Sequence, residues 1–256
     1  MFNFKKKVDI IMPNYNKGKY ISAAIKSVIN QSYKNWNLYI IDDNSQDNSK
    51  DQILIYKKDK RIKTIFLKKN KGPSFCRNYA LKKTKSYFIA FLDSDDYWKK
   101  NKLKHQLNFM YKKKYPFTFT DYIPILENKN KNYFLRRTNI ISSFTFNKFI
   151  GNSSINTSTM ILERKFIKNL KFRNLSLMED YIFKCDLMKK TNIPFKKFSN
   201  ASAIYRIIQK SRSSKKIKNI YHLWKLNKKY NKLDTFLNFK SIFNISFNSL
   251  KKYGFK

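Results

Sequence analysis

Residues 87–96 read YFIAFLDSDD, an apolar run that ends in three carboxylates. The apolar part indicates a buried strand, so Asp93, Asp95 and Asp96 follow directly at the end of that strand. Carboxylates at a strand end, one pair of them spaced i, i+2, suit a hard divalent cation that carries a phosphate ligand. The pattern therefore indicates an enzyme that acts on a nucleoside diphosphate.

Earlier apolar runs indicate three further strands, at residues 8–12, 36–41 and 62–67. Helices are expected between them, at 21–29, at 47–58 and from residue 72. Strands that alternate with helices predict a parallel sheet with right-handed crossovers. Ligands bind beyond the carboxyl ends of such strands. Pro13-Asn14-Tyr15, Asp42-Asp43 and Asp93-Ser94-Asp95 are therefore expected to meet at one edge.

The second half of the chain shows a different pattern. Strands are expected at 117–120 and 133–135, around a turn at 127–132, and again at 158–162 and 201–207. A helix is expected at 178–190, beginning with Glu179-Asp180 and directing Phe183 and Leu187 inward. Residues 213–256, in which Lys alternates with aromatic residues, predict a basic amphipathic helical tail.

The composition is strongly basic, with 56 Lys+Arg against 16 Asp+Glu and a formal net charge of +40. Lys far outnumbers Arg, and Asn, Ile, Phe and Tyr are abundant, which is typical of the residue drift of an AT-rich genome. Such a surface still attracts anionic lipid headgroups. With 42% hydrophobic residues in 256, the chain is not disordered and can bury a core.

Further features concern where the protein resides. The sequence has no apolar run of about 18 to 20 residues that could span a bilayer, and no signal peptide precedes the first strand. Cys76 and Cys185 are isolated from each other, which fits a reducing cytosol rather than a disulfide framework. A cytoplasmic protein is expected. Its tail, residues 213–256, either packs on the rest of the chain or contacts the inner face of the cytoplasmic membrane.

Five segments resemble, in order, the blocks of family-2 glycosyltransferases with the GT-A fold. They are VDIIMPNYN at 8–16, IIDDNSQD at 40–47, NKGPSFCRN at 70–78, FLDSDD at 91–96 and MEDY at 178–181. Asn44 stands where the family usually has Gly. The resemblance covers about residues 8–212 and implies a Rossmann-like, mostly parallel α/β sheet flanked by helices, followed by a basic helical C-terminal appendage. Within a domain at 1–212, the nucleotide-binding half is expected at about 1–114 and the acceptor half at about 115–212.

The resemblance also implies roles for the residues at the strand ends. The residues expected to bind the donor nucleotide are Pro13, Tyr15, Asp42, Asp43, Arg77 and Asp93. Tyr15 offers an aromatic face on which a base can stack, and Asp43 can accept the ring N–H of that base. Arg77 suits phosphate or the donor sugar. The alternatives are simple packing for Tyr15, a loop turn for Asp42-Asp43 and a surface ion pair for Arg77.

Asp95 is the candidate ligand of Mg²⁺ or Mn²⁺, with Asp93 reaching the ribose or a metal-bound water. The ion would bridge both phosphates and neutralise charge on the leaving nucleoside diphosphate. Asp96 is expected to be the N-cap of the helix that follows it. Some relatives use a histidine as another ligand. Here His105 lies on an expected helix and His222 in the Lys-rich tail, so neither clearly matches that position.

Asp180 is the candidate general base, which would take the proton of an acceptor hydroxyl as that oxygen attacks the anomeric carbon. A single displacement of this kind inverts the anomeric centre. Glu179 would orient the acceptor or shift the pKa of Asp180; alternatively, both acids merely favour a helix N-terminus. Arg206 and Ser211 lie in a stretch that resembles a late family segment, which often closes over the donor's phosphates. The resemblance implies that both residues contact the diphosphate.

These features predict a metal-assisted inverting glycosyltransferase that transfers a sugar from a nucleotide-diphosphate donor to a growing bacterial surface glycan, such as lipopolysaccharide or capsule. The resemblance implies a UDP-sugar donor and a glycan or glycolipid acceptor. A nucleotidyltransferase is one alternative, but it usually needs a Gly-rich phosphate loop, and residues 13–18 are poor in Gly. A basic nucleic-acid-binding protein is another. It lacks a recognisable binding module here, so no nucleic-acid partner is expected.

Overall fold

The structure, a computed structural model, describes residues 6–128, 131–134, 141–208 and 216–253. Its strands are β1 (Val8–Asn14), β2 (Trp36–Asp42), β3 (Ile62–Phe66), β4 (Phe88–Phe91), β5 (Tyr97–Trp98), β6 (Phe117–Asn128), β7 (Lys131–Phe134), β8 (Ser143–Phe144), β9 (Ile161–Glu163) and β10 (Phe195–Ile207). Its α-helices are α1 (Gly18–Ile29), α2 (Ser49–Leu54), α3 (Pro73–Lys83), α4 (Lys102–Lys113), α5 (Phe146–Ile150), α6 (Glu179–Thr191), α7 (Lys216–Leu226) and α8 (Thr235–Tyr253). Three short helical segments complete the described chain: η1 (Thr157–Thr159), η2 (Arg164–Ile167) and η3 (Asn227–Asn231).

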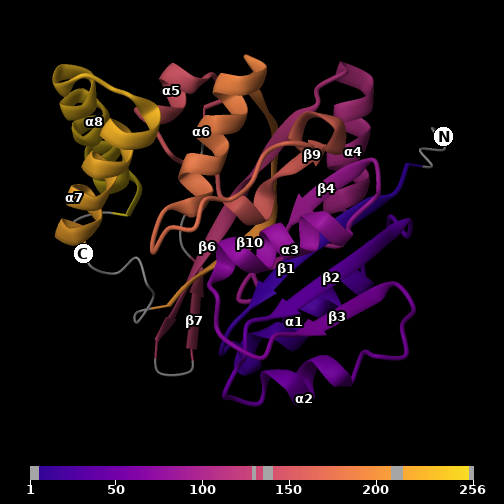
Figure 1. Cartoon of the computed structure of the whole chain (residues 1–256). Coiled ribbons are helices and arrows are strands. Elements are labelled where there is room, and N and C mark those ends of the chain that lie inside the picture. The colour runs from indigo at the N-terminus through magenta and orange to yellow at the C-terminus, as the bar shows by residue number, and fades with distance from the viewer. Residues whose placement is uncertain (1–5, 129–130, 135–140, 209–215, 254–256) are drawn as a thin grey trace.

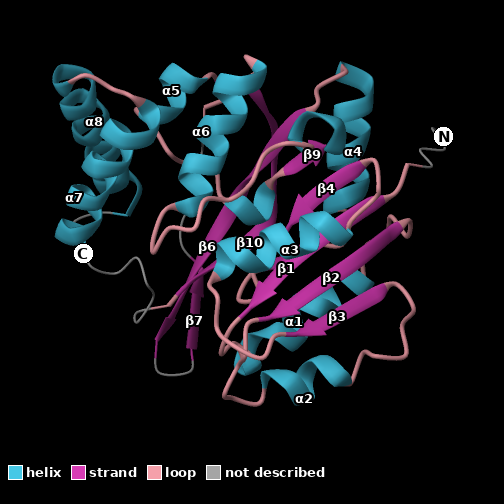
Figure 2. Cartoon of the chain, in the orientation of Figure 1, coloured by secondary structure: helices cyan, strands magenta, loops and turns pink. Residues whose placement is uncertain are grey.

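One sheet runs through the molecule in the order β3-β2-β1-β4-β9-β6-β10-β5, with β7 paired to β6 and β8 to β10 (Figure 1). The first four strands of this order are parallel to one another, and so are β6 and β10. The short β9 joins the two parallel groups by antiparallel pairing with β4 and β6. Helices flank the sheet, and α7 and α8 lie to one side of it (Figure 2). The expected mostly parallel α/β fold with a helical C-terminal appendage is confirmed.

The central strand β1 shows why the apolar runs predicted the sheet so well. It lies between two parallel neighbours, β2 and β4, and all seven of its residues are buried. A parallel strand covered on both faces carries a continuous apolar run rather than an alternating one. The four expected strands of the first hundred residues are confirmed. Their order places the carboxyl ends of β2, β1 and β4 side by side.

Residues 158–162 do not form the single strand that was expected. Thr157–Thr159 form the 3₁₀ segment η1, and β9 begins only at Ile161. The Asn156 side chain accepts the backbone N–H of Ser158 at 2.7 Å. This local bond stabilises a turn in place of a strand ladder, so the expectation was wrong for the first half of the segment.

The expectation that Asp96 is a helix N-cap was also wrong. The short strand β5 follows it, and α4 begins only at Lys102. Asp96 is buried, and its carboxylate contacts the backbone N–H of Arg206 at 3.0 Å and the Ser158 hydroxyl at 2.5 Å. The side chain therefore bonds to two distant segments rather than to the start of its own helix.

Other elements differ in length from those expected, and the strands β6 (Phe117–Asn128) and β7 (Lys131–Phe134) extend into the expected turn at 127–132. The helix expected at 47–58 is α2, which ends at Leu54, because the next N–H groups of Tyr56 and Lys57 bond to carbonyls three residues back. The last strand, β10, begins at Phe195 rather than at residue 201, and an irregularity in its pairing with β6 lies between Phe198 and Ala203.

The tail is packed on the rest of the chain through a buried polar network. Asn227 donates to Asn238 at 3.0 Å and to Ser241 at 3.1 Å, and Tyr181 of α6 donates to Asn227 at 2.9 Å. Ser241 also donates to the carbonyl of Ile150 at 2.5 Å. One face of α8 is thus fixed to η3 and to α5, and η3 is in turn bonded to α6. Across the described part of the chain, no helix has the length and apolar character needed to cross a membrane.

Lys102 of α4 has a buried ammonium group that lowers the stability of the fold. Its ammonium lies 3.9 Å above the Trp98 ring and has no hydrogen-bond partner among the described residues. Burial lowers the pKa of Lys102 well below its ordinary value. The folded state therefore disfavours the charged amine, whereas the unfolded chain accommodates it in water.

We expect Lys102→Met to raise the free energy of unfolding by about 1 kcal/mol, or roughly 2–4 °C in Tm at neutral pH. Because the folded-state pKa lies below the unfolded value of about 10.4, the cost in the native protein is largest at low pH and fades as pH approaches that value. Lys104→Met, an exposed substitution on the same helix, is the control. Thermal unfolding at about pH 7 and pH 10 measures both; an unstabilised Lys102→Met protein at pH 7 would contradict the expectation.

Candidate active site

The strand ends meet at one edge, as the alternation of strands and helices predicted. Asn14 of β1 lies opposite Asp42 of β2 in the sheet register and donates from Nδ2 to an Asp42 carboxylate oxygen at 2.6 Å. Asp42 also accepts the backbone N–H and the hydroxyl of Ser45. Asn44, which replaces the Gly usual in the resembling family, has φ of 63°. Asn is among the non-glycine residues that best tolerate this left-handed conformation, so the loop keeps its shape.

Asp43 fixes the loop that leads into α3. Its two carboxylate oxygens accept the backbone N–H groups of Lys71 and Gly72, each at 2.8 Å. Gly72 has φ of 83° and ψ of 162°, a combination that is essentially restricted to glycine. Asp43 therefore sets the position of the Gly72 turn beside the strand ends. Its expected contact with a nucleobase stays a prediction.

The segment after β1 places an aromatic ring and a cation at the same edge. Pro13 is buried within β1, whereas Tyr15 just beyond it is 46% exposed. Such exposure favours an available stacking face over simple core packing for Tyr15. Lys17 forms an ion pair with Asp95, at 2.8 Å between Nζ and Oδ2. The carboxylate expected to hold a metal ion thus already faces a positive charge.

Arg77 of α3 is the buried cation of the site, not the surface ion pair that was the alternative for it. Its guanidinium donates to Asp93 at 2.8 Å and to Glu179 at 2.9 Å, so it joins the end of β4 to the start of α6. Burial opposes the charge, but the carboxylates of Asp93 and Glu179 outweigh burial and raise the pKa of Arg77. The guanidinium also lies over the Phe172 ring, 5.3 Å from its centre.

Arg206 of β10 reaches the same edge from the second parallel group of strands. Its Nε donates to the carbonyl of Asp95 at 3.1 Å, and its guanidinium lies 3.8 Å from Glu127 of β6. The pKa of Asp96 is raised well above its ordinary value, chiefly by burial and then by the charges of Asp95 and Asp93. Ser211, the other expected diphosphate contact, lies outside the described residues.

Asp180, on the first turn of α6, is held by two donors that both contact the same oxygen. Thr157 donates to Oδ2 at 2.9 Å, and Lys184 donates to Oδ2 at 2.6 Å. Burial alone would raise the pKa of Asp180, but the Lys184 ammonium, with Arg77 nearby, outweighs it and holds that pKa well below the ordinary value. Asp180 is thus ionised at neutral pH, and its Oδ1 contacts no hydrogen-bond donor of the described residues.

The polar loop at residues 152–159 connects the two sets of carboxylates. Ser158 accepts the backbone N–H of Asp93 at 3.1 Å and contacts Asp96, while the adjacent Thr157 holds Asp180. The sequence-based argument assigned no role to this loop. Ser158 and Thr159 were expected in a strand, and no contact was predicted for the residues before them. Lys184 was also missed, although its i, i+4 spacing from Asp180 was a visible signal of a helical ion pair.

The residues at the end of β4 fit a hard divalent cation by their chemistry. Asp93 and Asp95 are both partly exposed carboxylates, and oxygen ligands are those that Mg²⁺ and Mn²⁺ prefer. His105 is exposed on α4, and the His222 ring lies by the carbonyl of Leu177. Among the residues that the structure describes, no group of three or more His, Cys, Asp or Glu side chains is arranged for metal binding.

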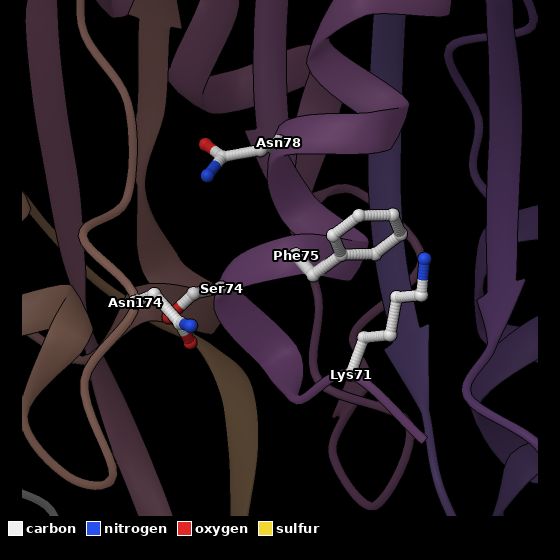
Figure 3. Close-up of a pocket in the computed structure, with 5 residues that line it drawn as sticks. All are labelled: Lys71, Ser74, Phe75, Asn78 and Asn174. Atoms are coloured by element: carbon white, nitrogen blue, oxygen red, sulfur yellow. The ribbon is translucent and has the colours of Figure 1, made fainter. Parts of the chain in front are cut away.

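Two pockets lie beside these groups. The first, of about 300 Å³, is lined by residues of α3 and its preceding loop together with Asn174 of the segment before α6 (Figure 3). Within it, Lys71 lies over the Phe75 ring, and the buried Ser74 hydroxyl has no partner among the described residues. It borders the turn that Asp43 holds.

The second pocket, of about 250 Å³, lies between β6, β10, the polar loop and α8. The described residues that line it are all uncharged: Tyr122, Asn152, Ser153, Ser154, Ile155, Asn156, Tyr205, Ile245, Asn248 and Ser249. Ile155 and Asn156 directly precede Thr157, and the Ile155 carbonyl accepts from Lys184 at 2.8 Å. The pocket therefore adjoins the network that holds Asp180.

Comparison with known proteins identifies the family. Residues 9–171 match the model of glycosyl transferase family 2. The chain belongs to this family, and it is a glycosyltransferase; the resemblance inferred from the five segments is confirmed.

Two of the similar proteins come from Escherichia coli and Bacillus subtilis. The chain is 37% identical, over 85% of its length and 83% of the relative's, to "UDP-Glc:alpha-D-GlcNAc-diphosphoundecaprenol beta-1,3-glucosyltransferase WfgD" of Escherichia coli. It is 33% identical, over 88% of each chain, to "Putative teichuronic acid biosynthesis glycosyltransferase TuaG" of Bacillus subtilis.

Solved structures share the fold. S. aureus TarS 1–349 in complex with UDP-GlcNAc superposes with a TM-score of 0.72 at 20% identity, over 96% of this chain and 73% of that one. Mannosyltransferase PcManGT from Pyrobaculum calidifontis, in complex with GDP-Man and Mn²⁺, superposes with a TM-score of 0.69 at 11% identity, over 94% of this chain and 70% of that one. At these identities the likeness establishes the fold alone.

We expect Arg77→Met to lower the free energy of unfolding by about 3–5 kcal/mol, because it leaves the Asp93 and Glu179 charges without their guanidinium. Lys165→Met breaks an exposed ion pair with Glu163 and should cost at most about 1 kcal/mol. Urea unfolding of the two variants beside the parent protein measures both values. Equal, small losses would show that the buried pair does not hold α6 to the end of β4.

Proposed function

We propose that this glycosyltransferase acts with inversion, moving a sugar from a nucleoside-diphosphate donor to an acceptor hydroxyl of a bacterial surface glycan. The observation that carries the proposal is the state of Asp180. It is ionised, held through Oδ2 by Thr157 and Lys184, and adjoins an uncharged pocket on one side. Through its neighbour Glu179 and Arg77, it is joined on the other side to the Asp93 carboxylate at the end of β4.

In this proposal the acceptor oxygen attacks the anomeric carbon while Asp180 accepts the hydroxyl proton. The bond from that carbon to the nucleoside diphosphate breaks, and its electron pair leaves with the diphosphate. A carboxylate of lowered pKa is a weak base toward a free alcohol. The hydroxyl becomes strongly acidic as its oxygen bonds to carbon, so the proton moves late, and an ionised, fixed acceptor is what this step requires.

We assign the donor to the edge formed by β2, β1 and β4. Tyr15 would stack on the base, beside Pro13. Asp42 and Asp43 would contact the base and ribose directly or through the loops that they hold. Arg77, Asp93 and Arg206 would contact the ribose, diphosphate or sugar. A UDP-sugar is the proposed donor, supported by the printed name of the E. coli relative and by TarS structures bound to UDP and UDP-GlcNAc.

Asp95, with Asp93 beside it, would hold Mg²⁺ or Mn²⁺ at this edge. When bound, the ion would supply charge neutralisation for the leaving diphosphate. The support is the pair of partly exposed carboxylates at the end of β4, together with the Mn²⁺ in the PcManGT structure of the same fold. The Lys17 ammonium contacts Asp95 in this structure, so this lysine would have to move from Oδ2 before an ion could bind there.

We assign the acceptor to the second pocket. Its aromatic rings, amides and hydroxyls match the faces and hydroxyls of a neutral sugar, and none of the described residues that line it is charged. The E. coli relative is named for an acceptor sugar on diphosphoundecaprenol, and another similar protein, TarP of Staphylococcus aureus, for poly(ribitol-phosphate). We therefore propose a glycolipid or glycan acceptor.

We further propose that about residues 1–114 bind the donor, about 115–212 bind the acceptor, and 213–256 form the tail. The proposed location is the cytoplasm, peripheral to the inner face of the membrane. It is supported by the two free, buried cysteines, Cys76 and Cys185, and by the lipid-linked acceptor in the name of the E. coli relative. Membership in the family favours glycosyl transfer over the nucleotidyl transfer and nucleic-acid binding considered from the sequence.

We expect Asp180→Asn to lower turnover at least about 100-fold and to leave UDP binding intact, because only the proton acceptor is lost. The assay is UDP release from UDP-glucose with a GlcNAc-diphospholipid acceptor. Thermal stabilisation by UDP, with and without Mn²⁺, reports donor binding. Asp186→Asn, which changes a surface ion pair on the same helix, is the control. Undiminished turnover in Asp180→Asn would exclude Asp180 as the base.

We expect Lys184→Met to shift the acid limb of the pH–activity profile to higher pH. Without the ammonium, the largest influence that opposes burial is lost, so the pKa of Asp180 rises towards the assay range although Arg77 and Thr157 still lower it. Lys184→Arg keeps the charge and Lys190→Met is an exposed control on α6. The measurement is kcat/KM against pH. Parallel profiles for Lys184→Met and the parent protein would show that Lys184 does not set the state of Asp180.

A further inference from the structure

Helix α8 presents a stripe of phenylalanines to the outside of the molecule. Four of them are 58–75% exposed: Phe236, Phe239, Phe243 and Phe247. At 3.6 residues per turn, their side chains fall within an arc of about 80° on one face of the helix. The Phe243 and Phe247 rings stack at 6.4 Å. A continuous aromatic stripe of this kind on a folded surface indicates a binding partner rather than scattered exposure.

The surroundings of the stripe are basic. Residues 213–256 contain eleven Lys and a single acid, Asp234. Lys240 lies on the exposed side of α8, and Lys225 and Lys228 of the neighbouring α7 and η3 are exposed as well. Helices with a Phe-rich apolar face and lysines beside it lie in the interface of anionic membranes, because apolar burial and attraction to the headgroups act together.

The opposite face of α8 is fixed to the protein and lines the proposed acceptor pocket. Asn238 and Ser241 are buried and hydrogen-bonded. Ile245, Asn248 and Ser249 are among the residues that line the pocket. Since Ile245 lies roughly opposite the phenylalanine stripe, one helix separates the pocket from the exposed stripe. An α-helix with its side chains is about 10 Å across, which is the distance this arrangement leaves between them.

We propose that α8 lies on an anionic lipid surface with its phenylalanine stripe among the acyl chains. It thereby holds the acceptor pocket one helix diameter from the membrane that carries the acceptor. This inference rests on the proposed function for the role of the pocket, but the lipid contact stands on the stripe and its charge. A second copy of the chain is disfavoured as the occupant, because two surfaces of formal charge +40 repel each other.

The test is co-sedimentation with vesicles of equal parts phosphatidylglycerol and phosphatidylcholine, and with vesicles of phosphatidylcholine alone. We expect the full chain to bind the anionic vesicles. The triple variant Phe239→Ser, Phe243→Ser, Phe247→Ser should bind them at least about tenfold more weakly, because apolar burial is lost and every lysine is kept. The matched control, Ile55→Ser with Tyr111→Ser, removes side chains that are 64% and 54% exposed away from the tail and should bind as the parent does.

Three results would overturn the proposal. Equal binding of the parent and the triple variant would mean that lysine charge alone attracts the vesicles. Failure of the parent to bind would remove the lipid contact. A parent dimer that becomes monomeric in the triple variant, with no vesicle binding, would make the stripe an interface between copies. Thermal stabilisation by UDP on the same samples tests the donor site separately, and circular dichroism checks that the triple variant is folded.

Discussion

The site depends on the burial of one guanidinium. Burying the charged guanidinium of Arg77 is costly unless carboxylates form well-aligned ion pairs with it. Asp93 and Glu179 do so from the end of β4 and from the start of α6, which are 86 residues apart in the chain. Each acid is placed by its own element, and the shared cation holds the two elements in register. The proposed donor edge and the proposed base therefore form one charged assembly.

The polar loop before β9 binds the other carboxylates of that assembly through uncharged hydroxyl groups. The Ser158 hydroxyl joins the Asp93 backbone to Asp96, and Thr157 shares Asp180 with Lys184. A 3₁₀ turn directs two consecutive hydroxyls to different carboxylates, which a regular strand, with alternating side chains, would not do in the same way. The departure from the expected strand at 158–162 thus accounts for how the acidic groups are held.

Helix α8 lines the proposed acceptor pocket on one face and exposes phenylalanines on the other. Its buried polar side chains bind it to α7, to η3 and to the end of α5, so its orientation relative to the pocket is set by hydrogen bonds as well as by packing. On its other face, four phenylalanines stay 58–75% exposed. Charge from the whole chain then favours an anionic partner on that side.

Local patterns in the sequence were enough for the parallel sheet and for the meeting of its acidic strand ends. Buried parallel strands are continuous apolar runs, and alternation with helices dictates that their ends converge. The hydrogen-bond partners of each acid could not be predicted from these local patterns. Asp96 was expected to be a helix cap, Arg77 had a surface ion pair as its alternative, Ser158 was expected in a strand, and Thr157 had no predicted role. Those contacts depend on which distant groups come within hydrogen-bond distance when the chain folds. Spacing along the sequence does not encode such distances in space.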